Sequence, residues 1–418
     1  MRKSLESWLQ YIQTLRPLEE DLNLERVKSV YRKLATDSLA DKIVIVGGTN
    51  GKGTTVEYLN ELAIANNLQV GAYTSPHLFN FNERIRVNGK TVSDLEIISA
   101  FEEIEDLREG TNLTYFDYAT LAAFFIFEKH ELDLVILEVG IGGRFDPVNI
   151  IEPDVSILTS VDLDHQNWLG NSKEEIGAEK AAIFRKNKPA ILGQIDLPEV
   201  VFSEAKRIGS DVVELNREFK VFNVSNNKWS YLFNYKEVKI EFNDLDHNNL
   251  SIEAASAALT AFFLLGYQDK GLIRGALNKT KLKGRCDLVS NKFLLDVSHN
   301  PASVKQLTSY LRNNFKNRQK ITAIFGVMQD KDVLEIILSI KDLVSRWVAV
   351  SPDIERAMPS NELSLLLKGA VKEEVYTEES VRKAIENIPD LKEDELVLVF
   401  GSFYTISEAF EAIKELGI

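Results

Sequence analysis

A glycine-rich turn follows an apolar, β-branched segment near the start of the chain. Residues 47–55 read Gly-Gly-Thr-Asn-Gly-Lys-Gly-Thr-Thr, and a helix-compatible stretch comes next. Glycines let backbone N–H groups turn toward an anion, and a following helix directs its positive end at the same place. Lys52 can reach outer phosphates, and a threonine hydroxyl can bind magnesium. The segment predicts a phosphate-binding loop rather than a plain turn, although Val46 and Gly53 depart from the common pattern.

Two further apolar strands end in polar side chains. Glu138 closes the strand at 133–139, and His165 follows the strand at 154–160. A buried carboxylate is costly unless it is paired or bound to metal, and α/β sheets place ligands at the carboxyl ends of parallel strands. We therefore expect Glu138 and His165 to lie near each other at a magnesium or phosphate site. The alternatives are a salt-bridged glutamate and a structural histidine.

Other segments carry weaker signals. By spacing alone, Lys180 belongs to an amphipathic helix and reads as a solvent-exposed surface lysine. Asp296 ends a strand shortly before His299 and Pro301. Asp296 could accept hydrogen bonds from a ribose or orient a base. The alternative is that this segment caps the helix that begins near Pro301.

Short apolar strands alternate with helical patterns in the first half of the chain. Strands are predicted at 42–47, 69–74, 133–139, 154–160 and 189–194, and helices at 54–67, 92–107, 116–130, 173–185 and 198–208. This alternation predicts a mostly parallel sheet covered by helices on both faces. Residues 4–36 predict a helix, a loop near Pro17 and a second helix. Residues 219–242 predict a small antiparallel insert, and a helix is expected at 252–265.

From about residue 290 the alternation starts again. Strands are predicted at 292–297, 320–326, 346–351 and 395–400, and helices at 301–315, 330–344, 360–369, 379–387 and 405–416. Because this half has a complete set of elements, we predict an α/β protein with domains at 1–285 and 290–418 and a hinge at 284–290. The first domain would hold the phosphate loop, and the second would be a smaller Rossmann-like domain.

Composition limits the classes of partner and location. A chain of 418 residues is too long for one ordinary core. Its net charge of −14, with no long basic run, disfavours nucleic acid and anionic membranes as partners. The single cysteine, Cys286, fits a reducing compartment. The chain starts without the apolar stretch of a signal peptide and contains no bilayer-spanning run. We expect a cytoplasmic monomer.

Taken together, the motifs resemble the folylpolyglutamate synthase family within the Mur-type ATP-dependent ligases. The likeness spans nearly the whole chain and is greatest to bifunctional members that also act as dihydrofolate synthases. It is carried by residues 48–55, 74–78, 83–87, 113–118, 137–144, 164–165, 168–170, 179–181 and 296–301. The Thr-Asn-Gly-Lys-Gly-Thr sequence is the variant of the phosphate loop that this family uses.

The resemblance implies a ligase that adds L-glutamate to dihydropteroate and to reduced folates through an acyl phosphate formed from ATP. It implies ATP contacts at Thr49, Asn50, Gly51, Lys52, Gly53, Thr54, Arg285 and Asp296. It implies Mg²⁺ at two sites, with Ser75, Glu138, His165 and a carbamylated Lys180 as ligands. Catalytic roles fall to Lys52 and Lys180, and to His299 for glutamate positioning or proton handling. The pterin side would involve Asp21, Leu22, Asn23, Thr114, Tyr115, Phe116, Asp117, Phe145, Asp146 and Pro147.

Two positions depart from the family pattern, and three other functions stay open. Glu253 stands where the family has an ATP-contacting asparagine, with Ser251 as an alternative alignment. The loop after Phe145 reads Asp-Pro-Val-Asn instead of Asp-Ala-Thr-Asn. The alternatives are a monofunctional folylpolyglutamate synthase, a Mur-type ligase for a cell-wall precursor, and a nucleotide-binding switch without ligase chemistry.

Overall fold

The chain divides into two compact units, Met1–Thr280 and Lys281–Ile418. The computed structural model describes residues 3–15, 23–34, 38–225, 227–315, 320–388, 391–392 and 394–418. Residues 284–290, which we predicted to be a hinge, belong to the second unit and include strand β12 (Asp287–Val289). That this segment works as a hinge stays a prediction.

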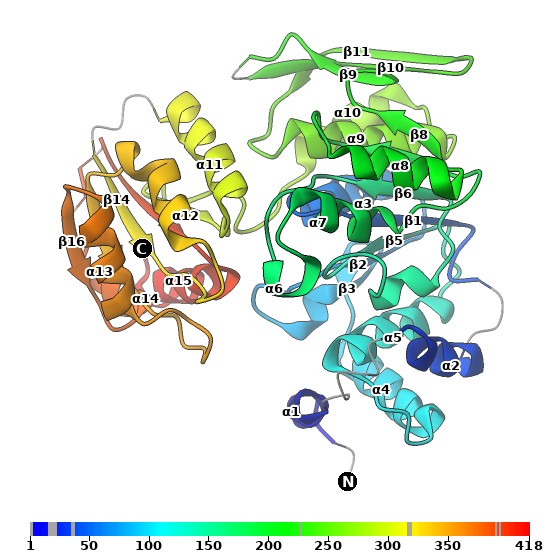
Figure 1. Cartoon of the computed structure of the whole chain (residues 1–418), viewed down its shortest axis with the longest axis horizontal. Helices are drawn as coiled ribbons and strands as arrows, with labels where there is room; N and C mark the ends of the chain where they lie inside the picture. Colours follow the sequence, from blue (N-terminus) through cyan, green and yellow to red (C-terminus); the bar gives the residue numbers. More distant parts are fainter. Residues whose placement is uncertain are drawn as a thin grey trace. The chain divides into compact units, whose positions relative to one another are not determined.

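The first unit is built on an eight-stranded sheet with the order β4-β3-β2-β5-β1-β6-β7-β8 (Figure 1). The strands are β1 (Lys42–Gly47), β2 (Val70–Tyr73), β3 (Ile85–Val87), β4 (Lys90–Thr91), β5 (Leu134–Glu138), β6 (Val155–Leu158), β7 (Pro189–Leu192) and β8 (Asp211–Glu214). All neighbours from β2 to β8 pair in parallel, whereas β3 pairs antiparallel with β2 and β4. The predicted mostly parallel sheet is therefore confirmed. Its central strands are continuous apolar runs because both faces are covered.

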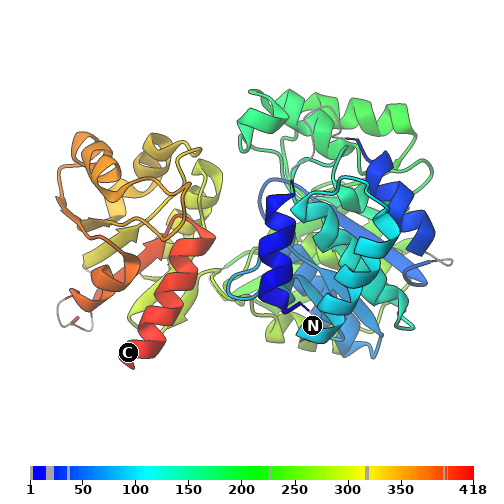
Figure 2. The same ribbon diagram turned by 90° about the horizontal axis from the view of Figure 1, so that it is seen from below.

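Helices cover this sheet and set the positions of the loops between strands. They are α1 (Leu5–Thr14), α2 (Glu25–Leu34), α3 (Lys52–Ala65), α4 (Asp94–Arg108), α5 (Tyr115–Glu128), α6 (Gln166–Leu169), α7 (Lys173–Ala181), α8 (Glu199–Ile208), α9 (Ile252–Leu264) and α10 (Lys270–Lys279), with short 3₁₀ turns η2 (Phe81–Arg84) and η3 (Pro147–Ile150). The predicted helix–loop–helix at the start matches α1 and α2, and Pro17 lies outside the described residues. Helix α1 packs on α4 and α5 (Figure 2).

Helix α7 is shorter than the helix we predicted at 173–185. It ends at Ala181, and the guanidinium of Arg185 then donates hydrogen bonds to the backbone oxygens of Ile183, at 3.1 Å, and Phe184, at 3.2 Å. A side chain thus satisfies carbonyls that a longer helix would have used. The early end leaves Lys180 in the last turn of α7.

The predicted antiparallel insert is confirmed as a separate sheet of β9 (Phe219–Phe222), β10 (Lys228–Tyr235) and β11 (Val238–Asp246) (Figure 1). This sheet packs on α9, where the hydroxyls of Tyr231 and Thr260 lie 2.7 Å apart. Helix α9 also contacts β6 and β7. Because α9 lies between two sheets, its alanine-rich sequence is buried on nearly every side.

The second unit has a six-stranded sheet with the order β12-β13-β17-β14-β15-β16. Besides β12, its strands are β13 (Phe293–Asp296), β14 (Lys320–Phe325), β15 (Arg346–Ala349), β16 (Glu374–Thr377) and β17 (Glu395–Phe400). Its helices are α11 (Pro301–Asn314), α12 (Val333–Ile340), α13 (Ser360–Ala370), α14 (Val381–Glu386) and α15 (Phe403–Leu416), with a 3₁₀ turn η4 (Lys341–Leu343). Only β12 pairs antiparallel, and α15 lies along β13 and β17 (Figure 2). The predicted second α/β unit is confirmed.

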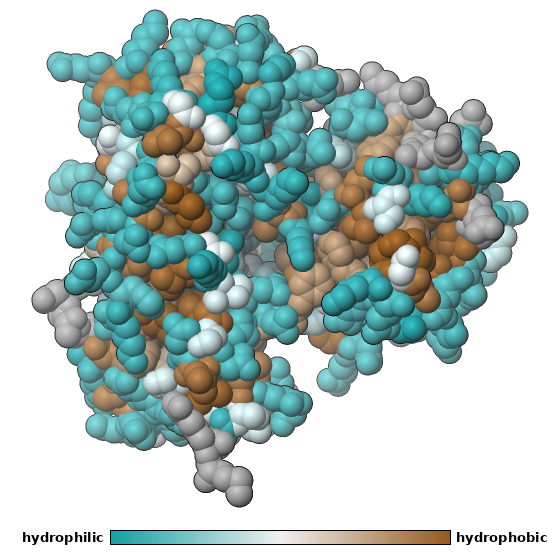
Figure 3. All heavy atoms as spheres, turned by 180° about the vertical axis from the view of Figure 1, so that it is seen from behind, coloured by the Kyte–Doolittle hydropathy of each residue, from teal (hydrophilic) through white to brown (hydrophobic). Residues whose placement is uncertain are grey.

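The surface agrees with the charged composition. Hydrophilic side chains surround separate hydrophobic areas on the face drawn in Figure 3. Among the described residues, every helix falls short of the length and apolar character that a membrane crossing requires.

Candidate active site

The phosphate loop predicted from the sequence connects β1 to α3. Gly48 has φ +142°, and a Cβ there would lie 1.9 Å from the hydroxyl oxygen of Thr159. Gly51 has φ +88° and directly precedes the first residue of α3, Lys52. Both conformations favour glycine, and Gly48 also lacks room for a side chain. The glycines therefore permit a tight turn from the strand into the helix.

The loop is tied to the residues that follow the neighbouring strand β6. The Thr49 and Asn50 N–H groups donate to the backbone oxygen and the hydroxyl of Ser160, at 2.8 and 2.9 Å. The Thr159 hydroxyl contacts the backbone oxygens of Asn50, at 2.7 Å, and Gly47, at 3.1 Å. Sequence reasoning missed Thr159 and Ser160. The available signal was a pair of hydroxyl residues placed directly after a buried strand.

Glu138 faces the start of α3 from the end of β5. It is 4% exposed, and one of its carboxylate oxygens accepts the Ser75 N–H at 3.1 Å. Its two oxygens lie 3.7 and 3.9 Å from where a Cβ on Gly53 would stand. These are ordinary van der Waals distances, so a side chain at position 53 would lie directly against this carboxylate. Gly53 and Thr54 lie in the first turn, whose N–H groups have no acceptor within the helix.

Two lysines donate to the same backbone oxygen. The Lys52 and Lys180 ammonium groups each lie 3.0 Å from the oxygen of Gly48. Lys180 is 4% exposed, so reading it as a surface lysine from its spacing was wrong. Burial and then the positive charge of Lys52 lower the pKa of Lys180 to about 7, whereas Asp164 and Asp146 act in the opposite direction. Lys180 is therefore a partly neutral amine near pH 7.

His165 lies at the same edge of the sheet, after β6. It has φ +50°, directly precedes α6, and donates its N–H to the Asp164 carboxylate at 2.8 Å. In sheet order β1 separates β6 from β5, so His165 and Glu138 follow strands on either side of the phosphate loop. Ser75 follows β2, the other neighbour of β5. The described residues hold no cluster of three or more His, Cys, Asp and Glu side chains arranged for a metal ion.

Two of the expected pterin residues are carboxylates that accept hydrogen bonds from backbone N–H groups. Asp117 is fully buried and accepts the Thr114 N–H at 2.8 Å. Asp146 accepts the N–H groups of Gly140, at 2.8 Å, and Val148, at 3.0 Å. Burial raises the pKa of Asp146 to about 7 even though these N–H groups favour its ionised form.

The remaining expected pterin residues differ in exposure. Phe145 is 56% exposed, and Pro147 is buried in η3. The Arg84 guanidinium lies over the ring of Tyr115, and Phe116 lies against Gly140. Asn23 accepts the N–H of Glu25 at 3.0 Å, while Asp21 and Leu22 lie outside the described residues.

In the second unit, Arg285, Asp296 and His299 gather around the end of β13. Asp296 is 5% exposed and accepts the N–H groups of Cys286, at 2.8 Å, and Ser298, at 2.9 Å. The Arg285 guanidinium and the His299 ring both face the ring of Phe403, at 5.2 and 6.3 Å.

Asn300, rather than Asp296, caps the helix that follows. Its side chain accepts the Ser303 N–H at 2.9 Å, and Pro301 is the first residue of α11. The capping that we gave as the alternative is therefore present in this segment. The Asp296 carboxylate instead accepts backbone N–H groups from the residue before β12 and from a residue after β13.

The position where the family pattern has asparagine lies at the start of α9. Ser251 caps this helix by accepting the Ala254 N–H at 3.1 Å. Glu253 is exposed and accepts the hydroxyl of Ser251 at 2.8 Å.

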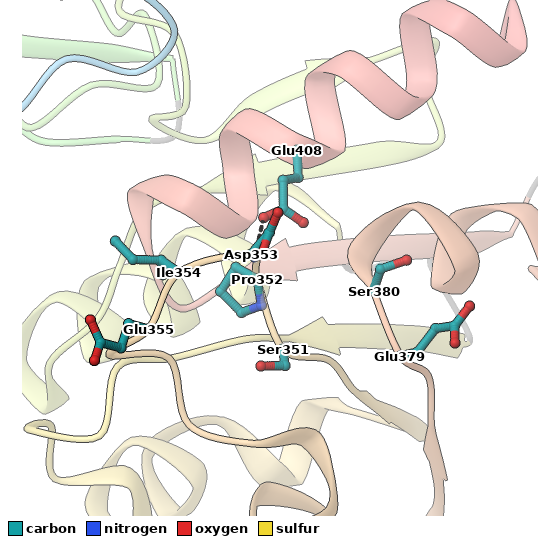
Figure 4. A pocket seen from close by; sticks show the side chains of 8 residues that line it. All are labelled: Ser351, Pro352, Asp353, Ile354, Glu355, Glu379, Ser380 and Glu408. Carbon is teal, nitrogen blue, oxygen red and sulfur yellow. Dashed lines mark hydrogen bonds between the residues drawn. The ribbon is translucent and has the colours of Figure 1, made fainter. Parts of the chain in front are cut away.

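A pocket of about 600 Å³ in the second unit contains none of the predicted site residues (Figure 4). It lies beyond the ends of β15 and β16 and is lined by Ser351, Pro352, Asp353, Ile354, Glu355, Glu379, Ser380 and Glu408. Its four carboxylates make it a poor place for a phosphate or a carboxylate ligand.

Two family models match the chain. The Mur ligase middle domain matches residues 46–259, and the Mur ligase glutamate ligase domain matches residues 284–403. The chain is also 35% identical to the dihydrofolate synthase/folylpolyglutamate synthase of Escherichia coli (strain K12), over 98% of this chain and 95% of that protein.

Solved structures extend the likeness to the whole fold. E. coli FolC in complex with DHPP and ADP has a TM-score of 0.93 and 34% identity, and the match covers 100% of this chain and 99% of that one. A crystal structure of a bifunctional folylpolyglutamate synthase/dihydrofolate synthase with Mn, AMPPNP and L-glutamate bound has a TM-score of 0.89 and 33% identity, with coverage of 100% and 98%.

Proposed function

Since this chain belongs to the Mur ligase family and, within it, to the dihydrofolate synthase/folylpolyglutamate synthases, we propose that it joins L-glutamate to folate-type acids at the expense of ATP. Dihydropteroate is the proposed acid for dihydrofolate synthesis, and reduced folates are the proposed acids for polyglutamylation. The relatives that carry this argument are named for both activities, and one solved structure holds a nucleotide analogue together with L-glutamate. ATP and small-molecule acids are therefore the substrates to test first.

The observation that carries the proposal is the loop with its two lysines and Glu138. A tight glycine turn, a helix N-terminus and the Lys52 ammonium meet beside a buried carboxylate. Phosphoryl transfer needs little more from a protein than positioning and charge stabilisation. We assign the phosphates of ATP to Gly51, Lys52, Gly53 and Thr54, with Thr49 and Asn50 holding the shape of the loop. On binding, Lys52 would exchange the Gly48 oxygen for a phosphate oxygen.

The reaction proposed here proceeds in two balanced steps. The substrate carboxylate attacks the terminal phosphorus of ATP, and ADP leaves with the electron pair of the broken bond. The resulting acyl phosphate then accepts the neutral amine of glutamate, phosphate leaves, and the amide nitrogen loses its proton. Lys52 and the first-turn N–H groups of α3 would stabilise the negative charge that gathers on the phosphoryl oxygens.

The donor set fits a divalent cation without a preformed cage. Mg²⁺ keeps several waters and takes only one or two carboxylates plus substrate phosphates. Glu138, Ser75 and His165, which follow β5, β2 and β6, are the proposed ligands. A cation there would neutralise phosphate charge.

Lys180 is proposed to be carbamylated and to serve a second cation. A neutral amine can attack CO₂, lose a proton and become a carbamate with a carboxylate-like charge. The lowered pKa of Lys180 supports this step because it supplies neutral amine near pH 7. The carbamate would bring oxygen ligands to the edge of the sheet where the loop lies.

For the second unit, we propose that Arg285 and Asp296 contact ATP and that His299 positions glutamate or handles a proton. Their gathering at the end of β13, around Phe403, supports a shared site. Residues 284–290 are the proposed hinge, and the proposed domains are 1–285 and 290–418. We further propose a cytoplasmic monomer that binds neither nucleic acid nor membrane, in keeping with its net charge of −14.

One experiment separates this proposal from its rivals. Purified protein is given ATP, Mg²⁺ and L-glutamate, with either dihydropteroate or tetrahydrofolate, and ADP release and glutamate incorporation are measured. We expect both acids to be used. Use of tetrahydrofolate alone would leave a monofunctional folylpolyglutamate synthase. Use of a UDP-linked cell-wall precursor instead, or ADP release that ignores glutamate, would overturn the proposal.

A further inference from the structure

Arg26, on α2, connects two of the segments expected to hold the pterin. Its guanidinium donates to both carboxylate oxygens of Asp117, at 2.7 and 3.2 Å, and to the backbone oxygen of Asn23, at 2.6 Å. The Arg26 side chain is 11% exposed and that of Asp117 is fully buried. A paired, desolvated fork of this kind fixes geometry far better than a surface ion pair.

Asp117 holds the start of α5 in the same arrangement. Together with Thr114 it forms a capping box, in which each side chain accepts the backbone N–H of the other residue. The ring of Phe116, the preceding residue, would meet a Cβ on Gly140 at 2.3 Å. Gly140 lies two residues after Glu138, so Asp117 is linked through Phe116 to the loop that leaves β5.

Helix α2 reaches the third expected pterin segment as well. It contacts η3, which begins at Pro147, and it contacts α5, where the rings of Tyr31 and Phe124 pack edge to face at 5.4 Å. The charge of Asp117 also helps to raise the pKa of Asp146, the residue immediately before η3. Arg26 therefore contacts two of the expected pterin segments directly, and its helix contacts the third.

We propose that Arg26 is a positioning residue for the pterin-bearing substrate, acting through Asp117 and the Asn23 backbone. The inference rests on the proposed function, because that function assigns the segments around Asn23, Phe116 and Pro147 to the pterin. The hydrogen bonds of Arg26 to Asp117 and Asn23 tie it to the segments expected to hold the pterin, and neither partner belongs to the phosphate loop. Loss of Arg26 should consequently weaken use of the acid substrate while leaving the use of ATP intact.

The test compares steady-state kinetics of Arg26→Ala and Arg26→Lys with those of the unchanged protein. For Arg26→Ala we expect KM for dihydropteroate to rise about tenfold or more, because small misplacements of binding groups have large kinetic effects. KM for ATP should stay within about twofold of the original value. Arg26→Lys keeps the charge but loses the forked guanidinium. Its KM for dihydropteroate should therefore lie between the values for the unchanged protein and Arg26→Ala. Added guanidinium ion should lower KM for Arg26→Ala.

The control is Arg32→Ala on the same helix. Arg32 is 70% exposed and pairs with Glu25 at 3.9 Å, so this change should leave both KM values unaltered. If Arg26→Ala leaves KM for dihydropteroate unchanged, or raises KM for ATP equally, Arg26 has no positioning role. Should Arg26→Ala be unfolded by circular dichroism, Arg26→Lys decides the question with the same two KM values. If the unchanged protein fails to ligate dihydropteroate at all, the proposed function itself is at fault.

Discussion

The backbone oxygen of Gly48 is the point at which the residues of the site depend most on one another. It accepts from Lys52 and from Lys180, and the charge of Lys52 helps to lower the pKa of Lys180. If Lys52 turned toward a phosphate, Lys180 would remain as a side-chain donor to this oxygen. The two lysines are therefore expected to have separate duties despite their common contact.

The first prediction concerns Lys52. Changing Lys52 to Ala should lower kcat for glutamate-dependent ADP release by about a hundredfold or more, because a charge that stabilises the transferring phosphoryl group is lost. The fold should persist, since Lys52 is half-buried and is not among the residues of the buried hydrophobic cluster. Lys220→Ala, an exposed lysine on β9, is the matched control. Turnover that survives Lys52→Ala would contradict the assignment of the phosphate loop.

The second prediction concerns Lys180. Lys180→Ala should lose activity, and small carboxylic acids should restore part of it by occupying the place of the carbamate. Lys206→Ala, an exposed lysine on α8, should neither lose activity nor respond to acids. The unchanged protein should also need CO₂ less at pH 8 than at pH 6, because protonation of an amine with pKa about 7 blocks carbamylation. Full activity of Lys180→Ala would contradict the assignment.

At the scale of residues, the sequence predicted the loop and the carboxylate but not their surroundings. The tight turn from Gly48 to Thr54 could be predicted because its glycines and the start of the next helix are adjacent in the chain. The burial of Lys180 could not be inferred, because it depends on a contact with Gly48 that is 132 positions away. Thr159 and Ser160 were missed for the same reason, since their partners lie about 110 positions earlier, at the end of β1 and in the turn that follows it.

At the scale of elements, the helices were easier to predict than the short strands. Capping residues such as Ser93, Thr114 and Ser172 mark helix starts within a few residues of the sequence. Strands β3, β4, β8, β12 and β16 were missed. Each is short and lies at or next to an edge of its sheet, so it lacks the continuous buried apolar run of the central strands. Helices α6 and α10 were also missed.

The third prediction concerns the end of α5. Burial, and then the charge of Glu103, raise the pKa of Glu128 from 4.5 to about 7, and its Oε1 has no hydrogen-bond partner among the described residues. Between pH 4.5 and 7 the folded chain keeps a proton that the unfolded chain has released. The unfolding free energy therefore falls as pH rises through this window.

Glu128→Gln removes this penalty because glutamine stays neutral. Its Tm should exceed that of the unchanged protein at pH 8, and the difference should shrink as pH falls toward 5. Glu131→Gln, at an exposed position, should change Tm at neither pH. An equal Tm difference at both pH values would show that ionisation of Glu128 is not the cause.

At the scale of the whole molecule, each unit has a core of its own. One cluster of buried side chains runs from Leu5 to Ala205 in the first unit, and another runs from Leu294 to Phe400 in the second. The sequence predicted this division from the restart of strand and helix alternation near residue 290. The position of the boundary depended on contacts near Thr280, which no local pattern marks.

The fourth prediction follows from these separate cores. Residues 281–418, expressed alone, should unfold cooperatively on heating, because their sheet and its helices bury one another. A mixture of fragments 1–280 and 281–418 at micromolar concentration should not restore ligation. The residues proposed for ATP and glutamate come from both units, and in the mixture the two units are no longer joined by the chain. Calorimetry and an ADP-release assay check the two statements. A fragment without a cooperative transition would show that the second core is incomplete.

The hydrogen bonds between the glycine turn and the residues after β6 have a consequence for timing. The carbonyls of Gly47 and Asn50 and the amides of Thr49 and Asn50 find their hydrogen-bond partners within the protein itself, in Thr159 and Ser160. The conformational entropy of this turn is therefore lost once, during folding, and need not be lost again in every catalytic cycle. A nucleotide should thus bind to a turn that already has its final conformation, and the turn should keep that conformation when the nucleotide is released.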